Sequence, residues 1–182
     1  MTQSVQLARV GEDFQNEFPG ADALASECFV NVVRVGDLLQ SELSRRLRHE
    51  AGLSTRALML LATVDGLGGR ATPSQIAAHV PISTAAITSL VDTNERKGLV
   101  ERRPHPDDRR KVQVVLTTQG QALLDRILPG AHILESEIIS ALTGDERANL
   151  LRILQKLQNS VEQVSQRAPS LPEASPRNKQ RR

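Results

Sequence analysis

Apolar residues recur at intervals of three and four positions along most of the chain, which is the pattern of amphipathic helices. Near the N-terminus this spacing predicts a helix of about 27 residues, roughly 40 Å long. Its apolar stripe consists of Leu24, Cys28, Val32, Val35, Leu39, Leu43 and Leu47. A helix this long cannot bury its stripe alone in so small a chain, so we expect it to pack against another long helix or another subunit.

Shorter helices are predicted downstream, each bounded by residues suited to helix ends. Ser54 is a good N-cap for a helix over residues 55–65, and Thr72 begins a capping-box sequence that opens a short helix. The next helix is predicted over residues 84–97 and ends at Gly98, which can adopt the left-handed conformation of a C-terminal cap. The last two of these helices are short and are joined by a tight turn.

The pattern then changes to that of strands. Residues 99–103 alternate weakly between apolar and polar, and residues 112–116 are rich in β-branched side chains. The charged loop between them makes a hairpin with a protruding tip. Two helices, a turn and a hairpin in this order describe a winged helix-turn-helix, whose second helix can enter the major groove of DNA.

Two more long helices follow the hairpin. Thr117 caps the first of them, and the Pro129-Gly130 pair within it should kink or break it. Thr143 begins a second capping-box sequence, which opens the last helix. The predicted fold class is mainly α with a small β-hairpin wing, a winged helix-turn-helix joined to a long-helix region.

Charge is concentrated in two places in this chain of 182 residues and formal net charge +2. Residues 95–111 hold seven basic and four acidic side chains, and residues 168–182 carry a net charge of +3. A basic segment in a neutral body is typical of a surface that meets phosphate, with a solvated loop of mixed charge as the alternative. The tail also contains three prolines and is expected to be disordered.

Composition excludes several other classes of protein. Aromatic residues make up 2% of the chain, which argues against a platform that stacks single-stranded nucleic acid. We see no signal peptide and no apolar run near the ~18 residues of a membrane span, so no membrane partner is expected. The lone cysteine, Cys28, makes a reducing, cytoplasmic setting the natural default.

The predicted recognition helix over residues 84–97 has two different sides. One side is apolar and faces the core, while the other carries small residues that can approach base edges closely. Hydroxyl groups can bond bases or phosphates, and alanine can contact a thymine methyl group. The alternative is an ordinary amphipathic helix with small residues on its wet side. The candidate DNA-binding residues on this helix are Thr84, Ala85, Thr88 and Ser89.

From about residue 53 to residue 125 the chain resembles the multiple antibiotic resistance regulator (MarR) family, and the flanking helices extend the resemblance to roughly residues 22–166. The most specific group is Asp108-Arg109-Arg110 at the wing tip, followed by Leu116-Thr117 and Gly120. The other matching runs are Thr72-Pro73-Ser74-Gln75-Ile76-Ala77, Ser89-Leu90-Val91-Asp92 and Glu95-Arg96-Lys97-Gly98-Leu99-Val100-Glu101-Arg102.

The resemblance implies a homodimer in which the first, fifth and sixth helices form the interface, and each subunit presents one winged helix to half of an inverted repeat. It implies that Arg110 reaches into the minor groove and that Asp108 holds that arginine or the wing backbone. A narrow A·T-rich minor groove concentrates negative potential, which suits arginine. Arg109 and Lys111 are expected to contact phosphates, with solvated loop charge as the alternative for each.

Two positions depart from the family pattern. Position 94 is usually aliphatic and here is Asn94, which must find hydrogen-bond partners or cost roughly 1–3 kcal/mol. We expect either a locally wet helix end or a bond from Asn94 to the wing backbone. Position 93, commonly arginine, is Thr93, so a phosphate contact is lost, and the basic tail over residues 168–182 could compensate for it.

The family further implies release of DNA by a small-molecule effector. We expect its pocket between the helical base and the reader, with mostly aliphatic lining and Phe29 as a candidate ring. Cys28 lies on the apolar stripe without an activating neighbour, which favours inert core packing over a reactive thiol. No metal site, cofactor or catalytic constellation is predicted, so the chain is not expected to be an enzyme.

The function predicted from the sequence is a sequence-specific regulator of transcription, expected to be a repressor, that binds double-stranded DNA as a homodimer. The alternative is a winged-helix module that binds protein without reading DNA. The predicted segments are a flexible arm (1–20), dimerisation helix 1 (21–53), the winged helix-turn-helix (54–117), dimerisation helices 5 and 6 (118–167) and a disordered basic tail (168–182).

Overall fold

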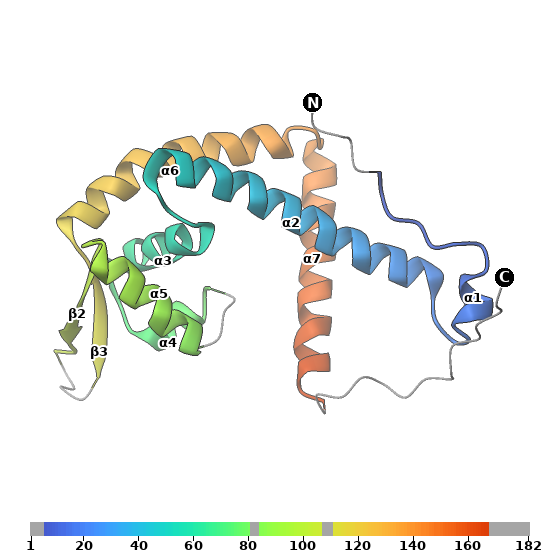
Figure 1. The fold of residues 1–182 in the computed structure, drawn as a ribbon, viewed down its shortest axis with the longest axis horizontal. Coiled ribbons are helices and arrows are strands. Elements are labelled where there is room, and N and C mark those ends of the chain that lie inside the picture. Colours follow the sequence, from blue (N-terminus) through green and yellow to red (C-terminus); the bar gives the residue numbers. More distant parts are fainter. Residues whose placement is uncertain (1–5, 81–83, 107–110, 168–182) are drawn as a thin grey trace. The chain divides into compact units, whose positions relative to one another are not determined.

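The computed structural model describes residues 6–80, 84–106 and 111–167 (Figure 1). The chain forms two compact units: Met1–Leu39 with Ile139–Arg182, and Gln40–Ile138. The fold is mostly helical with one small antiparallel sheet, as predicted. The helices are α1 (Phe14–Glu17), α2 (Ala23–Ala51), α3 (Thr55–Gly66), α4 (Pro73–Ala77), α5 (Thr84–Arg96), α6 (Thr118–Ile139) and α7 (Gly144–Ser165). The strands are β1 (Arg70–Ala71), β2 (Val100–Pro104) and β3 (Val112–Leu116).

The sheet has the strand order β1-β3-β2. In the predicted hairpin, Val100 lies opposite Leu116 and Pro104 lies opposite Val112. The strand β1, which was not predicted, has two residues, and its Arg70 pairs with Val115. Because β3 lies in the centre, β2 is an edge strand with one row of backbone groups facing away from the sheet.

The unit Gln40–Ile138 has a continuous apolar core to which its helices and its sheet contribute. The core residues with no exposed surface are Leu60, Leu61, Val64, Ala71, Ile76, Ile87 and Leu124. The start of α6 is fixed against the turn between α5 and β2, because the Thr117 hydroxyl donates to the Gly98 carbonyl at 2.6 Å. Gly120 allows this close approach: a Cβ there would lie 2.0 Å from the carbonyl oxygen of Leu99.

The caps predicted from the sequence are present. Ser54 accepts a hydrogen bond from the Ala57 N–H at 3.2 Å, and capping boxes at Thr72 and Thr143 open α4 and α7. Of the kink or break expected at Pro129, the break does not occur, because α6 continues through this residue. Buried neighbours on either side of the proline, Ile127 and Ala131, hold the helix against the core.

The N-terminal residues, expected to be a flexible arm, are attached to α2 from residue 8 onward. Asn31 forms two bonds with the backbone of Ala8, at 2.8 and 2.9 Å. Glu27 accepts from the Val10 N–H at 3.0 Å, and this bond, followed by that from Arg9, lowers the pKa of Glu27. The single-turn helix α1 follows, so the arm is partly ordered by specific contacts.

The long helices carry apolar faces that the single chain leaves open. On α2, Leu47 is the buried residue of the predicted stripe, and Cys28 is exposed, so packing of this thiol in the chain's own core is wrong. Helix α7 buries no residue at all, although its side chains follow a clear amphipathic pattern. Its exposed apolar residues are Leu151, Ile153, Leu154, Leu157, Val161 and Val164.

Candidate nucleic-acid interface

Helix α5 lies beside the β2–β3 hairpin and presents one side to solvent (Figure 1). Its buried side is anchored in the core by Ile87, Val91 and Asn94. The opposite side, at the spacing of successive helical turns, is an exposed stripe that we call the reading stripe. Its members are Ala85, Thr88, Ser89, Asp92 and Arg96. Small side chains at its N-terminal end leave room for close approach to a base edge.

The predicted DNA-binding residues fall into two groups in the structure. Ala85, Thr88 and Ser89 are exposed on the reading stripe, and Thr84 is the first residue of α5. Lys111 is exposed just before β3, where its carbonyl accepts from the His105 N–H at 2.9 Å and closes the base of the wing loop. The remaining candidates, Asp108, Arg109 and Arg110, lie outside the described residues.

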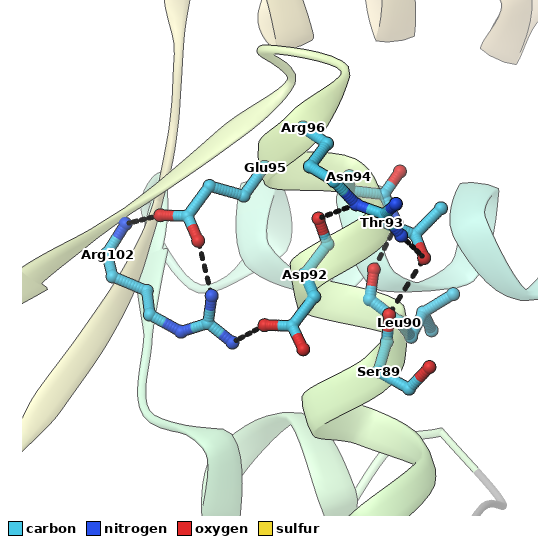
Figure 2. A network of polar contacts seen from close by, with 8 residues as sticks. All are labelled: Ser89, Leu90, Asp92, Thr93, Asn94, Glu95, Arg96 and Arg102. Carbon is cyan, nitrogen blue, oxygen red and sulfur yellow. Dashed lines mark hydrogen bonds and ion pairs between the residues drawn. The ribbon is translucent and has the colours of Figure 1, made fainter.

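A network of charged groups ties α5 to β2 (Figure 2). The Arg102 guanidinium donates to Glu95 through Nη1 and to Asp92 through Nη2. The Arg102 backbone N–H also donates to Glu95 Oε1 at 2.8 Å. Partial burial lowers the pKa of Arg102, but its bonds to Asp92 and Glu95 outweigh burial and raise the pKa above its ordinary value.

Arg96 is bonded to the helical turn before it. Its Nη2 donates to Thr93 Oγ1 at 3.3 Å, and its Nε donates to the Asp92 carbonyl at 3.3 Å. Thr93 Oγ1 in turn donates to the Ser89 carbonyl at 2.9 Å (Figure 2). The guanidinium of Arg96, a member of the reading stripe, therefore lies beside Thr93.

Asn94 is completely buried and bonds to its own helix. Its Nδ2 donates to the Leu90 carbonyl at 2.7 Å, and its Oδ1 has no partner among the residues that the structure describes. The predicted bond to the wing backbone is therefore wrong. An unpaired buried oxygen costs about 1–3 kcal/mol.

A hollow of about 570 Å³ lies between α2 and α6, within the unit Gln40–Ile138. Arginines line it together with an apolar floor, so its character differs from the mostly aliphatic pocket that we expected. Bonds from Arg45 and then Arg46 lower the pKa of Glu42 to about 2. Arg126, by contrast, donates to the Glu50 carbonyl at 3.5 Å and pairs with no carboxylate among the residues that the structure describes. The apolar lining is Leu43, Leu47, Ile127, Ala131 and Leu134.

Phe29, the candidate ligand-binding ring, does not line this hollow. It is 71% exposed and borders a shallow depression on α2 instead. Within the described ranges, no group of three or more metal-ligating side chains comes together. Among the same residues, no helix is both long and apolar enough to cross a membrane.

Three members of the reading stripe, Ala85, Thr88 and Ser89, were expected from the sequence, but the Arg102 network and the arginines around the hollow were not. The Arg102 network depends on the reversal of the chain at Gly98, which returns β2 alongside α5. The sequence did hold one signal for this network. Asp92 and Glu95 are three residues apart on a helix, so their carboxylates lie close enough to share one basic partner. The arginines around the hollow come from helices far apart in the sequence, and no local pattern marks them.

Comparisons with known proteins agree with this geometry. Residues 51–111 match the family model described as the MarR family. The transcriptional repressor YetL of Bacillus subtilis is 26% identical over 137 residues, which cover 75% of this chain and 82% of YetL.

Two solved structures share the fold. Sco3205, a MarR family transcriptional regulator from Streptomyces coelicolor in complex with DNA, has a TM-score of 0.72 and 22% identity, covering 77% of this chain and 89% of that one. The organohalide-sensing regulator RdhR-CbdbA1625 in its 2,4-dichlorophenol bound form has a TM-score of 0.71 and 21% identity, covering 86% and 89%.

Proposed function

Because the chain belongs to the MarR family of DNA-binding transcriptional regulators, we propose that it binds an inverted-repeat operator as a homodimer and represses transcription in the cytoplasm until a small molecule releases it. The observation that carries the proposal is the exposed reading stripe on α5, with small residues at its N-terminal end and a hairpin beside it. The name of YetL supports the repressor role, and the DNA complex of Sco3205 supports operator binding by this fold.

The reading stripe is suited to the major groove. Ala85 can contact a thymine methyl group, and the hydroxyls of Thr88 and Ser89 can bond bases or phosphates. Arg110 is proposed to enter the minor groove, and Lys111, exposed at the wing base, to contact phosphate. Two such readers in a dimer address half-sites about one helical turn apart.

The open apolar faces of α2 and α7 support the homodimer. Helix α7 has 22 residues and buries none of them, and a helix without tertiary packing is only marginally stable in water. A second copy of the chain supplies a matching face, because it carries the same two amphipathic helices. The exposed apolar residues of α2 are Leu24, Phe29, Val30, Val32, Val33, Val35, Leu38 and Leu39.

The hollow between α2 and α6 is the proposed effector site. Its apolar floor fits a small hydrophobic body, and Arg126, which no carboxylate pairs within the described part of the chain, can receive an anionic group. The dichlorophenol bound to RdhR-CbdbA1625 supports a small amphipathic molecule as the class of effector. Such a ligand would act on the reader through the two helices that carry it.

DNA reading is tested by fluorescence anisotropy at two salt concentrations, with DNA selected from a randomised pool and the same DNA scrambled. We expect tight, salt-dependent binding to the selected DNA alone, weakened by Arg110→Ala. Arg152→Ala, which removes an exposed arginine on α7, is the matched control and should bind as the wild type does. Failure to enrich any sequence from the pool would refute DNA reading and favour the protein-interaction alternative.

The dimer is tested by sedimentation of the wild type and of Leu157→Glu, which places a charge on the open face of α7. The variant should sediment as a monomer, whereas Gln158→Glu, one position along the helix, should not. A wild-type monomer at micromolar concentration contradicts the proposed assembly.

The effector class is tested with a panel of small carboxylates, each compared with its neutral amide, in the same anisotropy assay. Carboxylates should release the DNA and their amides should not, and Arg126→Gln should remove the difference. Equal release by acids and amides would contradict a role for Arg126 in binding the anion.

A further inference from the structure

The charged network between α5 and β2 joins Arg102 to both Asp92 and Glu95. We propose that Arg102 is a positioning residue for DNA reading: it sets the wing at a fixed angle to the recognition helix and neutralises the carboxylate of Asp92 on the reading stripe. This role rests on the proposed function, since it requires that α5 and the wing address the same DNA site.

The geometry of β2 explains how one arginine can fix the whole hairpin. Because β2 is an edge strand, the N–H groups on its outer side have no strand to pair with. Glu95 takes one of them, accepting from the backbone N–H of Arg102 at 2.8 Å, and it also accepts from the Arg102 guanidinium. Backbone and side chain are thus both attached to α5, which restrains the strand in position and in rotation.

The second carboxylate explains why an arginine is needed at this point. Asp92 lies on the reading stripe, one helical turn beyond Ser89, and its side chain is 51% exposed. An unpaired carboxylate there would repel the phosphates on either side of a groove. Arg102 Nη2 pairs with it (Figure 2), so the negative charge is neutralised at the edge of the surface that meets DNA.

The planar guanidinium is the group that can serve both carboxylates at once. Its Nη1 and Nη2 bond to different acids, which a single ammonium group on a flexible stem cannot reproduce with the same geometry. Arg103, the next residue of β2, pairs with Glu101 on its own strand and makes no link to α5 in the described contacts. The two arginines lie on the same strand and carry the same charge, but only Arg102 is linked to α5 in the described contacts.

This difference supplies the experiment. Arg102→Gln, Arg102→Lys and the control Arg103→Gln are compared with the wild type by anisotropy, on the selected DNA and on its scrambled counterpart, over a range of salt concentrations. The readout is the ratio of the two dissociation constants, because loss of charge alone weakens both complexes alike. Thermal unfolding of each variant verifies that the comparison is made between folded proteins.

We expect the ratio to fall at least tenfold in Arg102→Gln and to stay low in Arg102→Lys, with an unchanged salt dependence. Arg103→Gln should keep the wild-type ratio. If Arg102→Gln does not fold, Glu95→Ala removes the bonds that α5 makes to the backbone N–H and to the Nη1 of Arg102, and should also lower the ratio.

Two results would overturn the role of Arg102. One is a wild-type ratio in Arg102→Gln. The other is an equal loss on both DNAs, with a salt slope shallower by about 0.9 and rescue by lysine, which identifies Arg102 as a phosphate contact instead. If the wild-type protein itself binds the selected and the scrambled DNA equally, the proposed function is overturned. This outcome is distinct from failure of the Arg102 role, which appears only in the variants.

Discussion

Replacing Asn94 with leucine should stabilise the protein, because it removes a buried oxygen that lacks a hydrogen-bond partner. Asn94 has no exposed surface, and its Oδ1 is unpaired among the described residues. Its Nδ2 bonds to the Leu90 carbonyl, which as part of α5 also accepts the regular helical bond. Losing the amide group therefore leaves that carbonyl satisfied.

The magnitude follows from four opposing contributions. Removing the unpaired oxygen gains about 1–3 kcal/mol, and burying a leucine side chain gains about 1.5–3 kcal/mol. The lost Nδ2 bond costs about 0.5–1.5 kcal/mol, and fitting the larger side chain into a packed core costs about 1–3 kcal/mol. At the middle of these ranges the balance is a gain of about 1 kcal/mol, or a rise in Tm of about 2–4 °C.

The assay is thermal and urea unfolding followed by circular dichroism, at one protein concentration because the proposed dimerisation would make Tm depend on concentration. The control is Asn159→Leu on the polar side of α7, where the lost bond from Gln155 is exposed and the effect should stay within about 0.5 kcal/mol. A Tm of Asn94→Leu at or below that of the wild type would mean that Oδ1 is satisfied in solution, and would refute the reasoning.

Three further predictions concern other parts of the molecule. Gly120→Ala should destabilise by about 3 kcal/mol or more, because its Cβ would lie 2.0 Å from the Leu99 carbonyl, whereas Gly130→Ala on the same helix meets nothing within 4 Å and should be neutral or slightly stabilising by urea unfolding. Glu42, whose arginine partners hold its pKa at about 2 against an ordinary 4.5, contributes stability that is lost as pH falls from about 4.5 towards 2, so Glu42→Gln should flatten the acid side of a Tm–pH curve. Deleting residues 168–182 should weaken DNA binding and reduce the salt slope by up to about 0.9 per lost phosphate contact, and an unchanged slope would exclude the tail from the complex.

Helix positions could be predicted because their determinants are local. The capping boxes at Thr72 and Thr143 and the end of α2 at Gly52, with φ +61°, depend on a few neighbouring residues. The strand β1 has two residues and no pattern of its own, and its pairing with β3 bridges a long stretch of sequence. At Pro129 a local signal gave the wrong expectation of a break. The helix continues there because Ile127 and Ala131, before and after the proline, are packed in the core.

The candidate site was predictable to the extent that it lies on one helix. The exposed side of α5 follows from its periodicity, so the exposure of Ala85, Thr88 and Ser89 was predicted correctly, while their contact with DNA stays a prediction. The unusual asparagine at position 94 was also recognised, but its bond to the Leu90 carbonyl was not predicted. A buried amide has several acceptors within reach, and the sequence alone does not show which one it bonds. Arg102 was missed because its role arises between two elements.

Helix α2 is one continuous helix that belongs to both compact units of the chain. Its C-terminal end belongs to the unit that carries the reader and buries Leu47 there, while its N-terminal part belongs to the other unit and carries the open apolar face. The proposed effector hollow is lined by the last turns of this helix and by α6. A ligand there would contact the same helix whose other end is proposed to meet the second subunit. We propose that such a ligand changes the tilt of α2 and with it the spacing of the two proposed readers. Release of DNA by this route would need no change within the reader itself, only a loss of the spacing that fits two half-sites.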